Sequence, residues 1–186
     1  YTPIANPRYM MPKWSFGIRP ETVQKNVNAA RDAGAQIVVL LSHNGFDVDQ
    51  KLATIVTGID VILTGHTHDA VPQALKINKT LLLSSGSHGK YLGRIDLDVK
   101  GGEVVDYSST LIPVFSDVIT PDPEMSAHID ALRAPYEAEC NRVIGSTSGL
   151  LYRRGNFNGT WDDLICQGII EERDAEISLS PGFRWG

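Results

Sequence analysis

Two apolar runs of this chain end in histidines, and this arrangement limits the folds that are open to it. Residues 59–64 form an apolar run typical of a buried strand, and His66 and His68 follow it directly. A second run, residues 36–42, ends in the same way at His43. Since the ends of neighbouring strands lie side by side, we expect the three imidazoles to meet in one cleft. Zinc, manganese and iron all bind neutral imidazole, so the pattern predicts part of a metal site.

The rest of the first half alternates between helical and extended patterns. A helix is predicted to open at Pro20, which suits the fixed φ of a first turn, and to stop at Gly34. A second helix is predicted over residues 47–58. Three further strands are predicted over residues 80–85, 94–99 and 104–111. Helices between the early strands and a hairpin between the last two favour a layered α/β (α+β) sandwich over a fully parallel sheet.

The second half contains a linker and the beginning of another folded part. Proline and small polar residues over 112–122 indicate the linker. Beyond it, one amphipathic helix is predicted over 123–143, a second over 161–172, and a short strand over 175–180. These patterns predict three parts, namely residues 1–112, a linker with an interdomain helix over 113–144, and an incomplete domain over 145–186.

Composition excludes two classes of partner. The formal net charge is −5 and Lys and Arg form no run, which argues against a nucleic-acid partner. No apolar run approaches the roughly 20 residues that span a bilayer. Cys140 and Cys166 are too few for a disulfide framework, and two buried free thiols are favoured over a bridge. Because the chain begins at Tyr1 and ends just after an apolar segment, we expect an internal piece of a longer protein.

Three further polar residues are candidates for supporting roles, and a fifth histidine is not. His88 follows a predicted strand in a glycine-rich loop, where it either contacts substrate or is a structural loop residue. Asp69 and Asn44 stand beside the predicted ligands, where a side chain either orients an imidazole or caps its loop. His128 falls on a polar stretch of a predicted helix and is expected at the surface.

The segments around the predicted strand ends resemble a known family. They are similar to the later motifs of the calcineurin-like metallophosphoesterases, and within these to the 5′-nucleotidase branch. Their residues are 41–45, 63–68 and 85–94. Four stretches in order resemble more narrowly the SoxB-type thiosulfohydrolases of bacterial sulfur oxidation. These stretches are 6–14, 42–49, 65–70 and 180–186.

The resemblance covers nearly the whole chain and carries expectations about the fold. It implies the C-terminal part of a four-layer metallophosphoesterase sandwich. A linker helix and the start of a 5′-nucleotidase-type C-terminal domain are expected to follow.

The same resemblance implies a two-metal site, with manganese favoured and zinc or iron as alternatives. In such a site His43 and His66 bind one ion and His68 binds the other. Members of the family supply the remaining ligands from earlier motifs, namely an Asp-x-His, a bridging Gly-Asp and a Gly-Asn-His. This sequence contains none of the three motifs. We therefore expect the catalytic groups upstream, and expect these residues alone to bind metal weakly and to lack activity.

The family's C-terminal domain contacts its substrate through an Asn-x-Gly-Gly-Ile-Arg type segment. In the corresponding stretch of this sequence only Gly182 and Arg184 match. Arginine suits a tetrahedral oxyanion because its planar fork donates two parallel hydrogen bonds. A plain surface position in a loop is the alternative for Arg184.

The resemblance implies hydrolysis of a cysteine S-thiosulfonate on the SoxYZ carrier protein, with release of sulfate. It also implies a periplasmic location and a monomeric enzyme. A 5′-nucleotidase or another phosphomonoesterase is the first alternative. A non-catalytic binding module that retains part of the fold is the second.

Overall fold

The computed structural model describes residues 6–153 and 159–180, in two units that divide between Phe115 and Ser116. The division falls inside the stretch predicted as a linker. The finer boundaries, at 112/113 and 144/145, stay a prediction.

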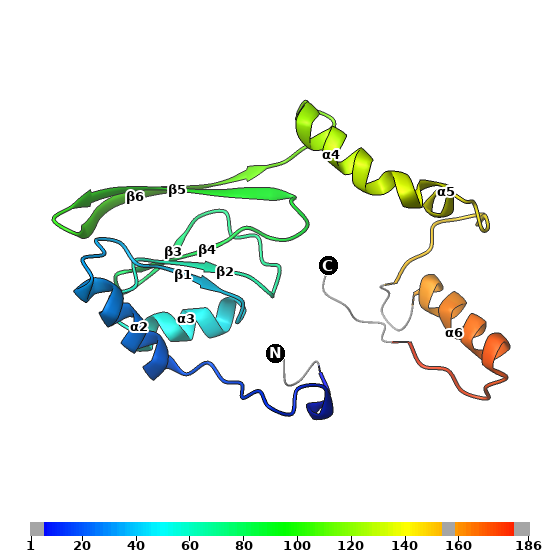
Figure 1. Cartoon of the computed structure of the whole chain (residues 1–186), viewed down its shortest axis with the longest axis horizontal. Helices are drawn as coiled ribbons and strands as arrows, with labels where there is room; N and C mark the ends of the chain where they lie inside the picture. The colour runs from blue at the N-terminus through cyan, green and yellow to red at the C-terminus, as the bar shows by residue number, and fades with distance from the viewer. Residues whose placement is uncertain (1–5, 154–158, 181–186) are drawn as a thin grey trace. The chain divides into compact units, whose positions relative to one another are not determined.

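The first unit is built on a four-stranded sheet with the strand order β1-β2-β4-β3 (Figure 1). Its strands are β1 (Val39–Ser42), β2 (Val61–Thr64), β4 (Thr80–Ser84) and β3 (Leu75–Ile77). The strands β1, β2 and β4 run parallel, and β3 pairs antiparallel with β4. Their register places Ser42, Thr64 and Ser84 side by side at the carboxyl ends of the parallel strands. The loops after these strands therefore start from one edge of the sheet.

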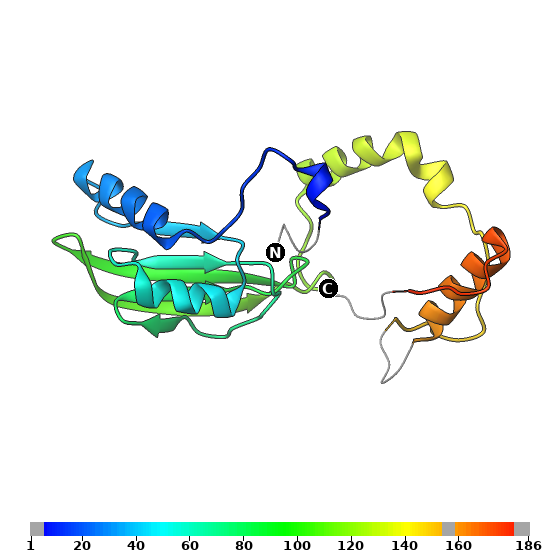
Figure 2. The ribbon, with the colours of Figure 1, turned by 90° about the horizontal axis from the view of Figure 1, so that it is seen from below.

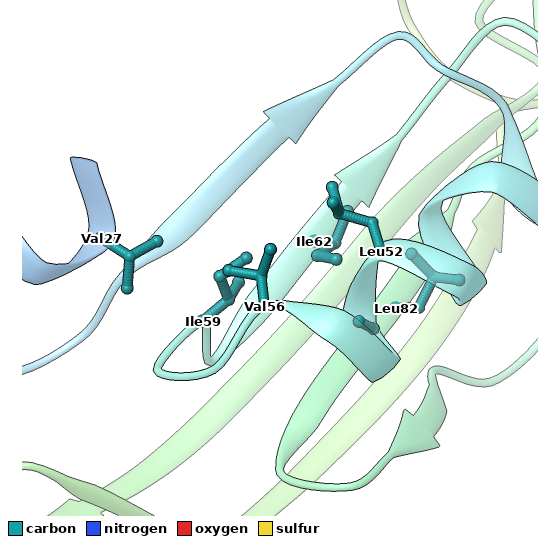
Figure 3. Packing of buried hydrophobic residues seen from close by; sticks show 7 residues of the cluster. Val27, Leu52, Val56, Ile59, Ile62 and Leu82 are labelled. Atoms are coloured by element: carbon teal, nitrogen blue, oxygen red, sulfur yellow. The ribbon is translucent and has the colours of Figure 1, made fainter. Parts of the chain in front are cut away.

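Helices α2 (Pro20–Asp32) and α3 (Phe46–Ile55) cover one face of this sheet (Figures 1 and 2). The buried cluster beneath them joins both helices to the strands β2 and β4. Figure 3 shows its members Val27, Leu52, Val56, Ile59, Ile62 and Leu82. Burial of each such aliphatic side chain stabilises the fold by about 1.5–3 kcal/mol. The cluster therefore fixes α3 against the strands whose ends carry the candidate site.

The hairpin of β5 (Tyr91–Lys100) and β6 (Glu103–Pro113) covers the other face of the sheet (Figures 1 and 2). Along β5, half-buried and exposed residues alternate, as expected when one face packs and the other meets solvent. Gly93 marks a close approach, because a Cβ added there would overlap Oγ of Ser85. In addition, the backbone N–H of Ala74 donates to Oγ of Ser109 at 2.7 Å. The hairpin is thus held against the segments that follow β4 and precede β3.

The predicted layered α/β fold is confirmed for the first unit. Both predicted helices and all five predicted strands are present, with ends shifted by a few residues. The sequence pattern does not predict β3, whose three residues are too few to show a period. The 3₁₀ turn η1 (Arg8–Met10) within the N-terminal stretch was not predicted either.

In the second unit, three helical segments occupy the stretch predicted as one helix over 123–143. They are α4 (Pro123–Arg133), the 3₁₀ turn η2 (Ala134–Tyr136) and α5 (Glu137–Cys140). The prediction of one unbroken helix is wrong, because Pro135 lacks the N–H of a helix interior and its ring clashes with the preceding turn.

Helix α6 (Thr160–Arg173) confirms the other helix predicted in the second half. Its first turn contains the buried Asp162, which forms an ion pair with Arg153 at 3.0 Å. Oγ of Ser180 also donates to Asp162, at 3.0 Å. The strand predicted over 175–180 is wrong, since within the described part of the chain this stretch pairs with no strand. Two hydrogen bonds tie it to α6, one from the backbone N–H of Ala175 to the carbonyl of Ile170 at 3.1 Å and one from the side chain of Ser180.

The two cysteines are free, as expected, but the prediction that both are buried is wrong. Cys140 is exposed and Cys166 is half-buried. His128 is exposed on α4, as expected. No helix within residues 6–153 and 159–180 has the length and apolar character that a membrane crossing requires.

Candidate metal centre

The imidazoles of His43 and His66 lie together at the carboxyl ends of β1 and β2. His43 follows β1 directly, and His66 follows β2 after Gly65. The backbone N–H of Gly65 donates to the carbonyl of Ser42 at 2.9 Å, which ties the two strand ends together. As a result, Nδ1 of His66 is 3.3 Å from Nε2 of His43. Two of the three predicted ligands are therefore in contact.

His68, the third predicted ligand, has a different neighbour. Its ring centroid is 5.6 Å from that of His88, with the two rings at 74°. The rings of His43 and His66 are 5.0 Å apart at 75°. The four imidazoles thus form two pairs. Because His88 belongs to the loop after β4, the loops of three neighbouring parallel strands supply all four rings.

Three of these four histidines have a left-handed backbone. The φ angle is 83° at His66, 59° at His68 and 58° at His88. This conformation is uncommon outside glycine, and His, Asn and Asp adopt it more readily than other residues do. Residues held in this way cluster at functional sites, where the surrounding contacts offset the cost.

The loop after β2 is held from two sides. On one side, the backbone N–H of Phe46, the first residue of α3, donates to Oγ1 of Thr67 at 3.1 Å. That hydroxyl in turn donates to the carboxylate of Asp69. On the other side, Oγ of Ser84 donates to the carbonyl of Asp69 at 2.6 Å. Asp69 therefore holds Thr67, the residue between His66 and His68, in place.

Asp49 is a residue of this region that the sequence analysis missed. It lies on α3 with 0% of its surface exposed. Its carboxylate accepts hydrogen bonds from Oγ of Ser42 at 2.7 Å and from Oγ1 of Thr64 at 2.5 Å. Asn44 joins the same group, because its Nδ2 donates to Oγ of Ser42 at 3.0 Å. A signal was present in the sequence, since Asp49 places a carboxylate on the apolar stripe of its helix, three residues before Leu52.

The surroundings of His66 favour its neutral form. Desolvation by the protein lowers the pKa of His66 from its ordinary value, and repulsion from the His43 ring lowers it further. A neutral imidazole keeps the lone pair that a metal ion needs.

The donor set fits a divalent metal, although these residues supply only part of a coordination shell. A structural zinc site takes four ligands, whereas His43 and His66 together offer two and His68 offers one. Within residues 6–153 and 159–180, no group of three His, Cys, Asp or Glu side chains is placed to hold an ion. Gly182 and Arg184, which the sequence predicts as substrate contacts, lie outside the described residues.

Solved structures resemble this chain along all or most of its length. The sulfate thiohydrolase SoxB of Thermus thermophilus, in complex with glycerol, matches 100% of the chain with a TM-score of 0.85 and 33% sequence identity. A 5′-nucleotidase precursor from Thermus thermophilus matches 86% of the chain with a TM-score of 0.75. Its sequence identity is 23%, so this likeness supports the fold alone.

Curated proteins are similar in sequence as well. The trifunctional nucleotide phosphoesterase YfkN of Bacillus subtilis is 30% identical over 176 residues, which cover 87% of this chain. A 5′-nucleotidase of Diplobatis ommata is 26% identical over 82% of it. No family model matches the sequence. The chain spans 34% of the SoxB chain, 12% of YfkN and 30% of the Diplobatis nucleotidase, so each likeness concerns a minor part of the relative.

Proposed function

Because this chain belongs to the SoxB-like 5′-nucleotidase family of metallophosphoesterases, we propose that it supplies histidine ligands to the two-metal centre of a hydrolase. The observation that carries the proposal is the 3.3 Å approach of Nδ1 of His66 to Nε2 of His43. Ring nitrogens from two different strands converge there, as the ligands of one ion do. His68 is assigned to the second ion. Manganese is the proposed metal, and the same nitrogen donors also suit zinc and iron.

When bound, a pair of divalent ions lowers the pKa of water and polarises the group under attack. The contribution of this chain is to hold the imidazoles in place and in the correct protonation state. The lowered pKa of His66 favours its neutral form, which keeps the lone pair that a metal ion needs. The hydrogen bonds of Thr67 to Phe46 and Asp69 fix the backbone between the two ligands of the β2 loop. His88, beside His68, is assigned to an anionic oxygen of the substrate.

The preferred substrate is a cysteine S-thiosulfonate on a SoxYZ carrier protein. The likeness to SoxB supports this choice, because it covers the whole chain at 33% identity. In the proposed reaction, the oxygen of a water molecule bonds to the terminal sulfonate sulfur. The bond between that sulfur and its sulfur neighbour breaks, sulfate leaves, and the carrier keeps a persulfide anion. Two protons pass to solvent, and no oxidant or reductant is consumed.

The remaining assignments come with this choice of reaction. Gly182 and Arg184 are proposed to bind the sulfonate oxygens. The proposed enzyme is monomeric and acts in the periplasm.

Hydrolysis of a nucleotide or another phosphomonoester is the second candidate function. The 30% identity with a nucleotide phosphoesterase favours it. Phosphoryl and sulfonate groups share a tetrahedral arrangement of oxygens, so the same centre suits both. The two candidates differ in the group that leaves the substrate.

A comparison of the two reactions tests the proposal. The complete gene product, loaded with Mn²⁺, is assayed for sulfate release from thiosulfonate-loaded carrier and for phosphate release from AMP. We expect sulfate release that His66→Ala abolishes and that His128→Ala leaves intact. Efficient phosphate release without sulfate release would overturn the preferred substrate. Bound metal with neither product would support a non-catalytic binding module instead.

A further inference from the structure

We infer that Asp49 is a positioning residue, which sets the distance between His43 and His66 so that both imidazoles reach one metal ion. The inference rests on the proposed metal centre and adds a residue to it. Asp49 belongs to α3 and lies outside the two loops that carry these histidines. Its carboxylate nevertheless bonds to the last residue of both β1 and β2, through Ser42 and Thr64.

Each oxygen of the Asp49 carboxylate accepts a hydrogen bond from a different strand. Oδ1 accepts from Oγ of Ser42, the residue that precedes His43. Oδ2 accepts from Oγ1 of Thr64, which stands two residues before His66. A carboxylate is a single rigid group, so the two hydroxyls are held at a fixed separation. Because Asp49 is fully buried, water cannot take over either bond.

The direction of these hydrogen bonds requires an acid at this position. Oγ of Ser42 already accepts from the backbone N–H of Asn44 at 3.2 Å and from its Nδ2 at 3.0 Å. A serine hydroxyl has two lone pairs and one proton, so its proton is what remains for Asp49. An asparagine at position 49 offers only one oxygen. Its amide nitrogen would then face Thr64, and one of the two ties would have to reverse or break.

A purely structural role accounts less well for a carboxylate at this position. Leu52 and Val56 already pack α3 against the sheet without polar contacts. Burying a carboxylate costs free energy that an apolar residue at position 49 would avoid. Asp49 is also the only charged residue that is buried in the described part of the first unit, and it lies where the ligand loops begin.

Thr80 provides a matched control at the opposite end of the sheet. It is buried, and its Oγ1 donates to the carbonyl of Ile59 at 2.8 Å. Thr80→Val therefore removes a buried hydrogen bond of the same sheet, at the start of β4 and away from the loops that carry the histidines. Thr64 offers a matched pair, because Thr64→Val deletes the donated proton while Thr64→Ser keeps it.

The test uses the complete gene product, freed of metal and titrated with Mn²⁺ by calorimetry, together with the visible spectrum of the Co²⁺ form and the unfolding temperature of the apoprotein. We expect Asp49→Asn and Thr64→Val to weaken Mn²⁺ binding by about tenfold or more, a range typical for groups that orient metal ligands. Their Co²⁺ spectra should change, since these report ligand geometry. Thr64→Ser and Thr80→Val should bind Mn²⁺ within about twofold of wild type, whatever their unfolding temperatures.

The measurements distinguish a failure of this inference from a failure of the proposed metal centre. Wild-type affinity and spectra in both Asp49→Asn and Thr64→Val would overturn this inference alone, provided that His43→Ala loses the metal. An equal loss in Thr80→Val would also overturn it, because the effect would then reflect general stability. A wild type that binds no Mn²⁺, or a His43→Ala protein that binds it normally, would overturn the proposed centre and this inference with it.

Discussion

Nδ1 of His66 lies 3.3 Å from Nε2 of His43, although the two residues are 23 positions apart in the sequence. This proximity arises because β1 and β2 are parallel neighbours that end at the same level. Two ring nitrogens so close together are either hydrogen-bonded or share a metal ion. The alternatives predict different behaviour when the histidines are removed.

His43→Ala or His66→Ala is expected to weaken Mn²⁺ binding to the complete gene product by more than about 100-fold. Loss of a metal ligand should weaken binding more than loss of a residue that only orients a ligand, which costs about 10–100-fold. If the two share one ion, the double variant will lose much less than the sum of the single losses. Isothermal titration and elemental analysis measure this. His128→Ala is the exposed control, and strictly additive losses would argue against a shared ion.

Metal should also stabilise the folded protein. Apoprotein prepared with a chelator is expected to gain about 2.7 kcal/mol when free Mn²⁺ reaches about 100 times its dissociation constant. Thermal unfolding with Mn²⁺, Zn²⁺ and Fe²⁺ under anaerobic conditions measures the gain and ranks the metals. Ca²⁺ serves as the control, because it prefers oxygen ligands. Equal stabilisation by Ca²⁺ would count against an imidazole site.

His88 is expected to act on the substrate and not on the metal. His88→Asn removes the imidazole while keeping a residue that accepts the left-handed backbone. We predict unchanged metal content and a kcat/KM about tenfold lower, mainly through KM. His68→Asn, the matched variant on the facing ring, should lose metal. Loss of one ion from the His88→Asn protein would instead identify His88 as a ligand.

Gly93 is expected to tolerate no side chain, because a Cβ there would overlap Oγ of Ser85 and lie 3.1 Å from Cδ2 of Leu83. Overpacking of this kind costs about 1–3 kcal/mol. Gly93→Ala should lower the free energy of unfolding by that amount in urea titrations, and adding Ser85→Ala should restore part of it. Gly168→Ala, in open space on α6, should instead gain about 0.5–1 kcal/mol.

The ion pair of Lys79 and Glu103 predicts a pH effect. A hydrogen bond from Lys79 at 2.8 Å, followed by its charge, lowers the pKa of Glu103. The pair therefore stabilises the fold above the pKa of the unfolded state, and this contribution is lost as pH falls through the lowered folded value. Lys79→Met should return the pKa of Glu103 to its ordinary value in an NMR titration. Lys76→Met is the control, and an equal shift there would point to a general charge effect.

The strand ends of the first unit could be predicted from the sequence because their signals are local. An apolar run that stops at a histidine marks both the strand and the level of the side chain, as at His43 and His66. The hairpin could be predicted from a local signal too, because Lys100, Gly101 and Gly102 form a hairpin-type connection between its strands. Local periodicity failed at Pro135, where the apolar period continues across a residue that interrupts the helix.

Other features depend on the tertiary structure and could not be predicted in this way. The pairing of His68 with His88 requires knowing that β4 lies beside β2. The role of Asp49 requires knowing that α3 passes beneath two strand ends. Periodicity indicates that a residue faces the core, but it does not identify the polar groups that the residue contacts there.

The row of Ser42, Thr64 and Ser84 across the three parallel strands has a use beyond this protein. Each hydroxyl stands at the end of an apolar strand and donates a hydrogen bond, to Asp49 or to the carbonyl of Asp69. In a distant relative that has lost its metals, the positioning role of Asp49 predicts that this acid and its two hydroxyl partners are replaced together with the histidines. The serine or threonine that ends the third strand bonds to the β2 loop and not to Asp49, so it should be retained there.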